Sequence, residues 1–226
     1  MFKNKKILAI IPARLGSKRI KNKNIIPFKG KPLIFKTLQV AKRCKYIDKL
    51  VVSSESKKIL NICKSQGVNT PFLRKKAYDD YSSVQQATLS AIEQAEKFYG
   101  KFDVVIQLMV NCPLRKLSTL NKCIKNFFIK KKDSQISFFD YGFANPWWAH
   151  KIVKSKINPI YKKKLFQRSQ DLEKLYCPTG SIWISKISTL KKYKTFYSPN
   201  YGYFLMNFKE ALDIDNLEDL ELAKRL

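Results

Sequence analysis

The feature that most constrains the fold is the alternation of short apolar runs with amphipathic helical patterns. Apolar runs occupy residues 6–11, 50–53 and 104–109, which is typical of strands buried in a parallel sheet. Helical periodicity occupies residues 31–44, 55–66, 82–98, 117–129 and 216–224. This alternation predicts an α/β fold with a mostly parallel sheet, in a single domain spanning residues 1–226.

A basic loop directly follows the first apolar run. It reads Ile11-Pro-Ala-Arg-Leu-Gly-Ser-Lys-Arg-Ile20 and continues as Lys21-Asn-Lys-Asn-Ile25, with cations on both sides of Gly16. Cations and backbone amides at the carboxyl end of a parallel strand suit an anion that carries several phosphates. The alternative is a solvated basic loop, which a lysine-rich chain can form anywhere. The attachment to the first strand and a later acidic segment favour phosphate binding.

That acidic segment is Asp213-Ile-Asp215, near the end of the chain. If residues 212–214 end a strand, the two carboxylates point to the same side. Hard oxygen ligands in that position suit Mg²⁺ that bridges substrate phosphates. The alternative is that Asp215 or Asn216 caps the last helix and Asp213 is solvated. Since a triphosphate needs both a cationic cradle and a metal, we expect Mg²⁺ as the cofactor.

The alternation is interrupted at residues 135–178, a long excursion rich in Phe, Tyr and Trp. Such a segment is either a peripheral hairpin packed on its own core or a lid or interface arm. It contains the single histidine of the chain, His150, beside Trp147 and Trp148. A lone histidine in this context is expected to be a packed polar residue and not a base.

Composition and charge exclude several classes of protein. The net charge of +28 raises the alternative of a basic nucleic-acid-binding module, but the lysines are scattered and no nucleic-acid-binding motif is present. Five cysteines without CxxC spacing favour neither a disulfide framework nor a zinc site. No apolar run approaches the length of a membrane span and no signal-peptide pattern precedes the first strand, so we expect a cytoplasmic protein without a membrane partner.

The basic loop, with Lys23-Asn24, resembles the first motif of the acylneuraminate cytidylyltransferases, which make CMP-activated sialic acids and related nine-carbon sugars. The similarity continues in order through Gly30-Lys-Pro-Leu33, Val51-Val-Ser-Ser54, Pro71-Phe-Leu-Arg74, Cys112-Pro-Leu-Arg115, Arg168-Ser-Gln-Asp-Leu172 and Asp213-Ile-Asp215. This resemblance implies a three-layer α/β/α sandwich like that of the nucleotide-diphospho-sugar transferases, a Rossmann-like arrangement. It also implies a protruding arm at about residues 135–178 that forms a homodimer and helps to cover the active site of the second subunit.

The activity implied by the resemblance joins CTP to an acidic sugar, giving a CMP-nonulosonic acid and pyrophosphate. The implied catalytic residues are Arg14, Lys23 and Asp215, the last also helping to activate the attacking hydroxyl. The implied nucleotide-binding residues are Ala13, Arg14, Gly16, Lys18, Lys23, Asn24, Asp79 and Ser83, although Ser82 or Ser83 is also a good helix cap. The implied sugar-binding residues are Asn111, Arg168 and Gln170, and the implied metal ligands are Asp213 and Asp215.

The chain departs from the family pattern where the sugar is expected. Met109-Val-Asn-Cys112 replaces the usual Gln-Pro-Thr-Ser, in which the Gln contacts the sugar, and Thr179-Gly-Ser-Ile-Trp-Ile184 replaces Asn-Gly-Ala-Ile-Tyr-Ile. Arg168-Ser-Gln-Asp-Leu172 resembles the pseudaminic-acid branch more than the sialic-acid branch. The acceptor is therefore N-acetylneuraminate or a close relative; pseudaminic or legionaminic acid is the first alternative, and 3-deoxy-octulosonate, through a related cytidylyltransferase, is the second.

Overall fold

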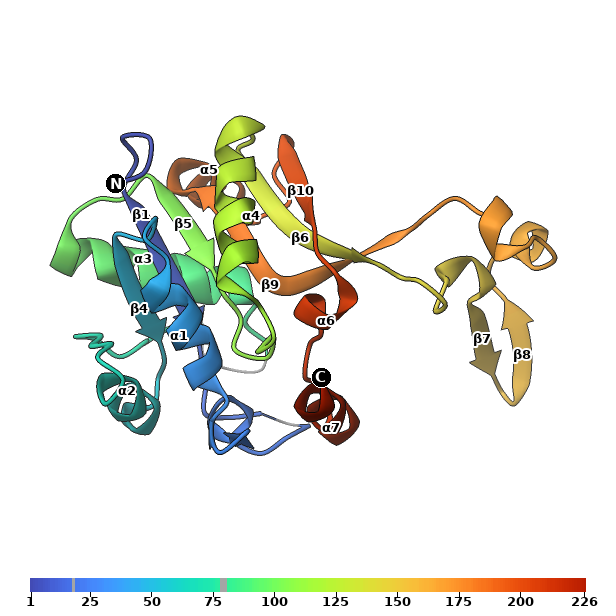
Figure 1. The fold of residues 1–226 in the computed structure, drawn as a ribbon, viewed down its shortest axis with the longest axis horizontal. Coiled ribbons are helices and arrows are strands. Elements are labelled where there is room, and N and C mark those ends of the chain that lie inside the picture. Colours follow the sequence, from blue (N-terminus) through green and yellow to red (C-terminus); the bar gives the residue numbers. More distant parts are fainter. Residues whose placement is uncertain (18, 78–80) are drawn as a thin grey trace.

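The computed structural model describes residues 1–17, 19–77 and 81–226. Its centre is a six-stranded sheet with the order β10-β6-β9-β5-β1-β4 (Figure 1). The pairs β1–β4, β1–β5 and β10–β6 are parallel, whereas β9 runs antiparallel to both β5 and β6. The strands are β1 (Ile7–Pro12), β4 (Lys49–Ser53), β5 (Val104–Gln107), β6 (Ser134–Asp140), β9 (Tyr176–Lys186) and β10 (Tyr201–Leu205).

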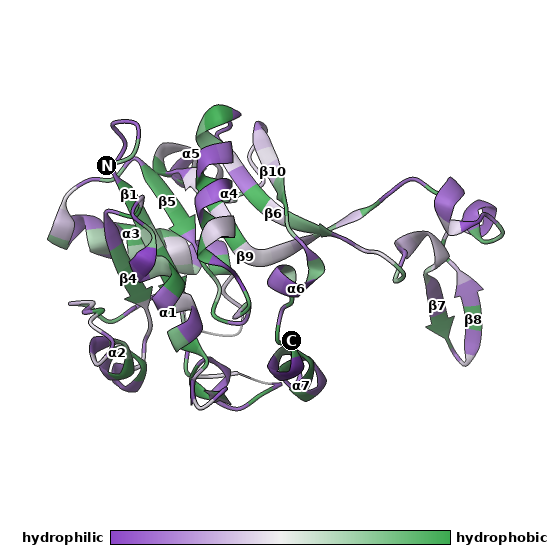
Figure 2. Cartoon of the chain, in the orientation of Figure 1, coloured by the Kyte–Doolittle hydropathy of each residue, from purple (hydrophilic) through white to green (hydrophobic). Residues whose placement is uncertain are grey.

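Helices cover both faces of this sheet because alternate side chains of the buried strands point to opposite sides. On β1, Ile7 and Ile11 pack in the cluster that holds α1 (Ile34–Arg43) and α4 (Leu117–Ile129), whereas Leu8 and Ile10 pack in the cluster that holds α3 (Val84–Tyr99) and α5 (Ile187–Tyr193). The central strands are accordingly hydrophobic along their length (Figure 2). The predicted α/β/α sandwich with a mostly parallel sheet is confirmed.

The helices predicted from periodicity are present with small shifts. Besides α1, α3 and α4, they are α2 (Lys57–Lys64) and α7 (Leu217–Arg225). The predicted helix start at residue 31 is wrong, because Lys31–Pro32 forms β3 and pairs with β2 (Pro27–Phe28). Lys29 and Gly30 both have positive φ, 48° and 78°, which is the conformation of a tight hairpin turn. A 3-10 turn, η1 (Lys23–Ile25), precedes this hairpin, and α6 (Phe208–Ala211) precedes the last helix.

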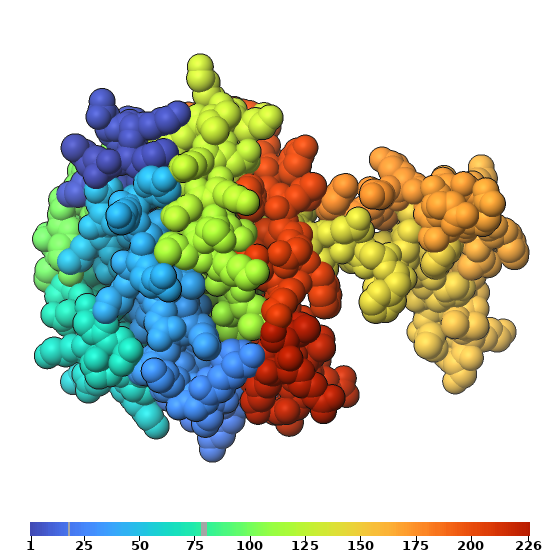
Figure 3. All heavy atoms as spheres, in the orientation of Figure 1, coloured from blue at the N-terminus to red at the C-terminus, as the bar shows by residue number. Residues whose placement is uncertain are grey.

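Between β6 and β9 the chain leaves the sheet and forms a separate lobe (Figures 1 and 3). The lobe holds the hairpin β7 (His150–Val153) and β8 (Lys156–Pro159), with the 3-10 turns η2 (Pro146–Trp148), η3 (Lys162–Lys164) and η4 (Ser169–Asp171). It has a small aromatic contact of its own, Trp147 against Tyr161 with ring centroids 5.1 Å apart. Large apolar side chains nevertheless remain exposed, including Phe143 at 96% and Phe166 at 91%.

Three smaller expectations concern histidine, cysteine and membranes. His150 is exposed, so its expected packing beside the tryptophans is wrong; its Nδ1 lies 2.7 Å from the Trp148 carbonyl oxygen. All five cysteines are free, as their spacing predicted, and burial raises the pKa of Cys112 to about 12, which makes its thiol unreactive. Within the described ranges, no helix is long and apolar enough to cross a membrane.

Candidate active site

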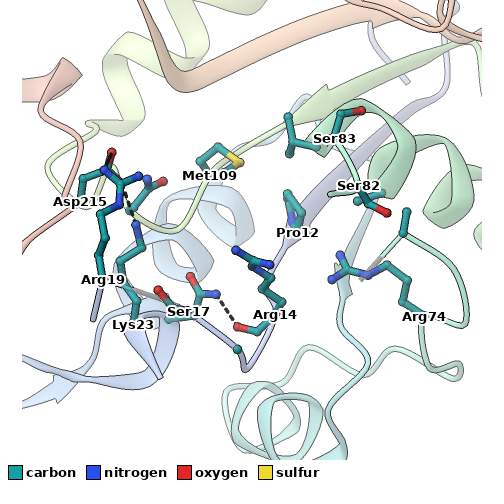
Figure 4. A pocket seen from close by; sticks show the side chains of 16 residues that line it. Pro12, Arg14, Ser17, Arg19, Lys23, Arg74, Ser82, Ser83, Met109 and Asp215 are labelled. Atoms are coloured by element: carbon teal, nitrogen blue, oxygen red, sulfur yellow. Dashed lines mark hydrogen bonds and ion pairs between the residues drawn. The ribbon is translucent and has the colours of Figure 1, made fainter. Parts of the chain in front are cut away.

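A cleft of about 390 Å³ opens where β1 and β5 end, at the carboxyl edge of the parallel strands (Figure 4). Ligands of open α/β sheets bind at this edge. Figure 4 shows Asp215, Arg19 and Lys23 together at one side, Arg74, Ser82 and Ser83 at the other, and Arg14 between them. The lining residues come from the end of β1 and the first loop, from the segment before α3 and its first turn, from the segment after β5 and from the loop before α7: Pro12, Arg14, Gly16, Ser17, Arg19, Lys23, Asn24, Arg74, Ala77, Ser82, Ser83, Val84, Ala87, Met109, Asn111 and Asp215.

The first loop is held in place by hydrogen bonds that tie it to the rest of the fold. The Ala13 amide donates to the Ser53 carbonyl at 2.9 Å, and the Leu15 amide donates to Glu55 Oε1 at 2.7 Å. The Asn24 side chain donates to the Arg14 carbonyl at 2.8 Å. Two of these hydrogen bonds tie the loop to the chain at the end of β4 and the third crosses the loop, so its backbone is held in one arrangement. This distinguishes it from the solvated basic loop of the alternative.

Lys23 joins this loop to the acidic segment at the other end of the chain. Its Nζ donates to the Ile214 carbonyl at 2.8 Å and to Asp215 Oδ1 at 2.9 Å. Arg19 Nη1 lies 2.9 Å from the other carboxylate oxygen, Asp215 Oδ2. Cations and carboxylate expected at the triphosphate therefore lie in direct contact, although 192 residues separate Lys23 from Asp215.

The acidic segment lies in a loop between α6 and α7, so the expected strand ending at residues 212–214 is wrong. One backbone hydrogen bond, from the Ile214 amide to the Asn111 carbonyl at 2.8 Å, fixes the segment beside the chain that follows β5. Asn216 is the N-cap of α7, and Asp219 accepts from the amides of Asp215 and Asn216. The carboxylate of Asp215 is therefore not the cap.

Asp213, two residues before Asp215, is half-buried. Its Oδ1 and the Oδ1 of Asn111 are buried and have no hydrogen-bond partner among the residues that the structure describes. Burial raises the pKa of Asp213 to about 6, and the charge of Asp215 adds to this rise, while Lys23 and a hydrogen bond with Asn111 oppose it. The carboxylates of Asp213 and Asp215, with Asp213 Oδ1 unpaired, supply the hard oxygen ligands that Mg²⁺ prefers.

These donors fit Mg²⁺ only in combination with a substrate. Among the residues that the structure describes, no group of three or more His, Cys, Asp or Glu side chains can hold a metal ion. Mg²⁺ is usually bound by one or two carboxylates together with substrate phosphates and water. Asp213 and Asp215 are therefore suited to a metal ion that arrives with a phosphorylated ligand.

The other side of the cleft combines a buried arginine with a helix start. Arg74 Nη2 lies 3.2 Å from Glu55 Oε2, and Nη1 donates to the Ser53 carbonyl at 3.2 Å. Burial lowers the pKa of this guanidinium and Glu55 opposes the change. Ser83 is the N-cap of α3 in a capping box with Gln86, so it has the structural role and also lines the cleft. Since Glu55 contacts both the Leu15 amide and the Arg74 guanidinium, it connects the first loop with the opposite side of the cleft.

The segment after β5 is held by Arg115. This buried guanidinium donates from Nη2 to the Met109 carbonyl at 2.9 Å and from Nε to Ser181 Oγ at 3.1 Å. Met109 itself lines the cleft, and Gly180 lies beside it: a Cβ at residue 180 would come within 2.9 Å of Met109 Cγ. The glycine thus leaves room for the Met109 side chain.

The structure brings most of the predicted site residues together. Arg14, Gly16, Lys23, Asn24, Ser83, Asn111 and Asp215 line the cleft, and Asp213 lies behind Asp215. Ala13 is buried within the loop and does not line the cleft. Lys18 and Asp79 lie outside the described residues.

Two predicted sugar-binding residues do not reach this cleft. Arg168 and Gln170 lie in the lobe, in an exposed segment where Arg168 Nε donates to Asp171 Oδ2 at 2.8 Å. Sequence reasoning left Arg19, Arg74 and Met109 out of the site. The motif Pro71-Phe-Leu-Arg74 could have indicated Arg74, and the replacement of the family Gln could have indicated Met109. The only signal for Arg19 was its position in the basic loop.

Because the pKa of Asp213 is raised in the folded state, we expect the stability of the protein to depend on pH. In the folded state this carboxyl binds a proton more tightly than its ordinary value of 3.8 implies, so the free energy of unfolding falls as the pH rises from about 4 to 6. The rise of the pKa from 3.8 to about 6 lowers the free energy of unfolding by at most ~3 kcal/mol, and by less after solvent screening. We expect Asp213→Asn to remove this decline and to raise the Tm above pH 6. Thermal unfolding of both proteins between pH 4 and 8 tests this, and parallel curves would contradict it.

The comparisons with known proteins place this chain among the nucleotidyltransferase enzymes. The family model described as cytidylyltransferase matches residues 8–226, and the chain belongs to this family. It is 32% identical over 226 residues to a pseudaminic acid cytidylyltransferase of Campylobacter jejuni, covering 98% of this chain and 96% of the relative. It is 33% identical over 230 residues to a CMP-N,N'-diacetyllegionaminic acid synthase of Legionella pneumophila, with the same coverage.

The fold comparison agrees with this assignment. The solved structure of a CMP:2-keto-3-deoxy-manno-octonic acid synthetase complexed with CTP has a TM-score of 0.72 to this chain, at 15% identity and 97% coverage of both chains. At this identity the likeness shows the shared fold. The Rossmann-like, nucleotide-diphospho-sugar-transferase arrangement expected from the sequence is thereby confirmed.

Proposed function

We propose that this enzyme transfers CMP from CTP to the anomeric hydroxyl of a nonulosonic acid and releases pyrophosphate, with Mg²⁺ as cofactor. The observation that carries the proposal is the contact of Lys23 and Arg19 with Asp215 at the edge of a cleft of nucleotide size. In the reaction, a bond forms between the sugar oxygen and the α-phosphorus. The bond from that phosphorus to the β-phosphate oxygen breaks, and the hydroxyl proton is lost.

In this reaction the residues of the cleft act mainly by position and charge. Arg14, Arg19 and Lys23 bind the triphosphate and stabilise the charge that grows on the leaving pyrophosphate. Asn24 and Ser83 contact the nucleoside, and Arg74 adds a cation at that side. Asp213 and Asp215 hold Mg²⁺, which when bound neutralises phosphate charge, and Asp215 assists removal of the hydroxyl proton.

The acceptor we propose is a sugar of the pseudaminic or legionaminic kind. The two relatives above are named for these acids. Met109 lines the cleft where the family pattern has a sugar-binding Gln, and a thioether cannot donate a hydrogen bond to a sugar hydroxyl as an amide can. A less hydroxylated acceptor suits such a wall better than N-acetylneuraminate.

Pyrophosphate release tests both statements. CTP, UTP and ATP are each incubated with Mg²⁺ and one acid from a panel: pseudaminic, N,N'-diacetyllegionaminic, N-acetylneuraminic and 3-deoxy-octulosonic acid. We expect turnover with CTP and one of the first two acids. Faster turnover with N-acetylneuraminic or 3-deoxy-octulosonic acid would overturn the acceptor assignment, and no turnover with any acid would overturn the function.

We further propose that the exposed lobe joins two copies into a homodimer and completes the partner's cleft, with Arg168 and Gln170 at the sugar. Exposed apolar side chains such as Phe143 and Phe166 support this, because aromatic residues are enriched at interface anchors. The exposed guanidinium of Arg168 suits bidentate binding of a sugar carboxylate.

Mixing two inactive variants tests the shared site. Arg168→Ala and Lys23→Ala subunits are mixed under conditions that allow exchange. A heterodimer then has one intact cleft, so we expect recovery of about a quarter of wild-type activity for random pairing in a two-fold symmetric dimer. The control mixture pairs Lys23→Ala with Asp215→Asn, two changes in the same cleft, and should recover nothing. A monomer by light scattering, or no recovery in the first mixture, would refute the shared site.

A further inference from the structure

The cations around Asp215 leave neither of its oxygens free. Lys23 Nζ lies 2.9 Å from Oδ1 and Arg19 Nη1 lies 2.9 Å from Oδ2 (Figure 4). A metal ion that binds this carboxylate must therefore compete with two ion pairs. Two cations within contact distance also repel a divalent ion that approaches the same oxygens.

The two ion pairs are not equivalent. The side chain of Lys23 is 15% exposed and its Nζ is also anchored by the Ile214 carbonyl. The side chain of Arg19 is 66% exposed, and Asp215 is the acid it contacts among the described residues. An exposed ion pair of this type contributes little stability, so it breaks readily when a stronger anion competes for the guanidinium. Arg19 is the movable member of the pair.

A nucleoside triphosphate is such an anion. It carries several negative charges, and guanidinium groups bind phosphate with two parallel hydrogen bonds. A triphosphate bound along the first loop would draw Arg19 away from Asp215 Oδ2, whereas Lys23 keeps its anchor on the Ile214 carbonyl. Oδ2 would then be free at the moment when phosphate oxygens, the remaining metal ligands, are also present.

We propose that Arg19 is a gate on the metal site: it occupies Asp215 Oδ2 in the free enzyme and is released by the triphosphate, so that the divalent ion binds only with the nucleotide. This inference rests on the proposed function for the identity of the nucleotide and of the metal. It adds Arg19 to the site as a residue with two successive partners, first Asp215 and then phosphate. The consequence is that free divalent cations bind only weakly to the enzyme without nucleotide.

Binding of Mn²⁺, measured by electron paramagnetic resonance without nucleotide, tests the gate directly. We expect weak binding to the wild-type enzyme and binding about tenfold tighter to Arg19→Ala, since one ion pair and one repelling charge are removed. Lys21→Ala is the matched control, because it removes an exposed cation from the same loop without touching Asp215. Asp215→Asn in the Arg19→Ala background should abolish the gain, which places the bound ion at this carboxylate.

Three results would overturn the proposal: equal Mn²⁺ affinity of wild type and Arg19→Ala, an equal gain in Lys21→Ala, or a gain that survives Asp215→Asn. A second arm adds a non-hydrolysable CTP analogue, with which wild type and Arg19→Ala should bind Mn²⁺ with similar affinity. If the wild type remains as weak as without the analogue, release by the nucleotide is refuted. Because the assay needs no sugar and no turnover, a wrong acceptor leaves its result unchanged, and pyrophosphate release judges the proposed function separately.

Discussion

Lys23→Ala is expected to lower the kcat of pyrophosphate release by about 10²-fold or more, since loss of one preorganised donor at a developing charge has an effect of this size. Lys23 is held firmly at the cleft: its side chain is 15% exposed and contacts both the Ile214 carbonyl and Asp215. Lys23→Arg should restore only part of the activity, because a planar guanidinium cannot replace a compact ammonium between these two oxygens.

The matched control for this prediction is Lys21→Ala, an exposed lysine two residues earlier in the same loop. Its loss removes the same formal charge from a chain of net charge +28 and should leave kcat within about twofold. Arg14→Ala should resemble Lys23→Ala, because Arg14 lines the centre of the cleft. If both alanine variants at residues 14 and 23 retain near-wild-type turnover, the first loop is not the triphosphate site.

Asp215→Asn is expected to lower Mg²⁺-supported activity by about 10³-fold while leaving the fold intact, since a missing metal ligand removes several kcal/mol of charge stabilisation from the transition state. The fold should persist because the cap of α7 is Asn216, and because the contact that Asp215 makes with the helix start uses its backbone amide. The substitution keeps the shape of the side chain and removes its charge.

Thermal unfolding and activity measured on the same preparation separate the two roles. We expect the Tm of Asp215→Asn to stay close to that of the wild type, since its ion pair with Arg19 is largely exposed and adds little stability. Lys23, the other cation paired with Asp215, keeps the Ile214 carbonyl as a partner in this variant. Glu218→Gln, an exposed carboxylate in the first turn of α7, is the control and should affect neither quantity. A loss of activity that merely follows a loss of stability would indicate a structural role for Asp215.

Local pattern in the sequence was sufficient for much of the fold. The apolar runs at β1, β4 and β5 and the periodicity of α2, α3, α4 and α7 predict these elements, because each pattern reports which faces of a segment are buried. Strands β6, β9 and β10 were missed. Polar residues interrupt the apolar positions of these strands, and β6 and β9 flank the aromatic lobe. The antiparallel direction of β9 is visible only in the structure.

The candidate site divides in the same way between sequence and structure. Residue types and spacing indicated the first loop and Asp213 and Asp215 as candidate site residues, and the resemblance of motifs identified the family that the comparisons show. The strand expected before Asp213 was wrong, since α6 ends at Ala211 and the following loop has one backbone hydrogen bond to the chain after β5.

By itself, then, the sequence determined the alternation of strands and helices, the cationic loop and the family, because these depend on neighbouring residues and on ordered motifs. Only the tertiary structure decided that Arg19 and Lys23 contact Asp215, that Asn216 and not Asp215 caps α7, and that Arg168 lies outside the cleft of its own chain. The physical reason is topological. The order of strands in the sheet brings the carboxyl ends of β1 and β5 together. The loop before α7 lies beside them, so that Asp215 contacts Lys23, 192 residues earlier in the chain.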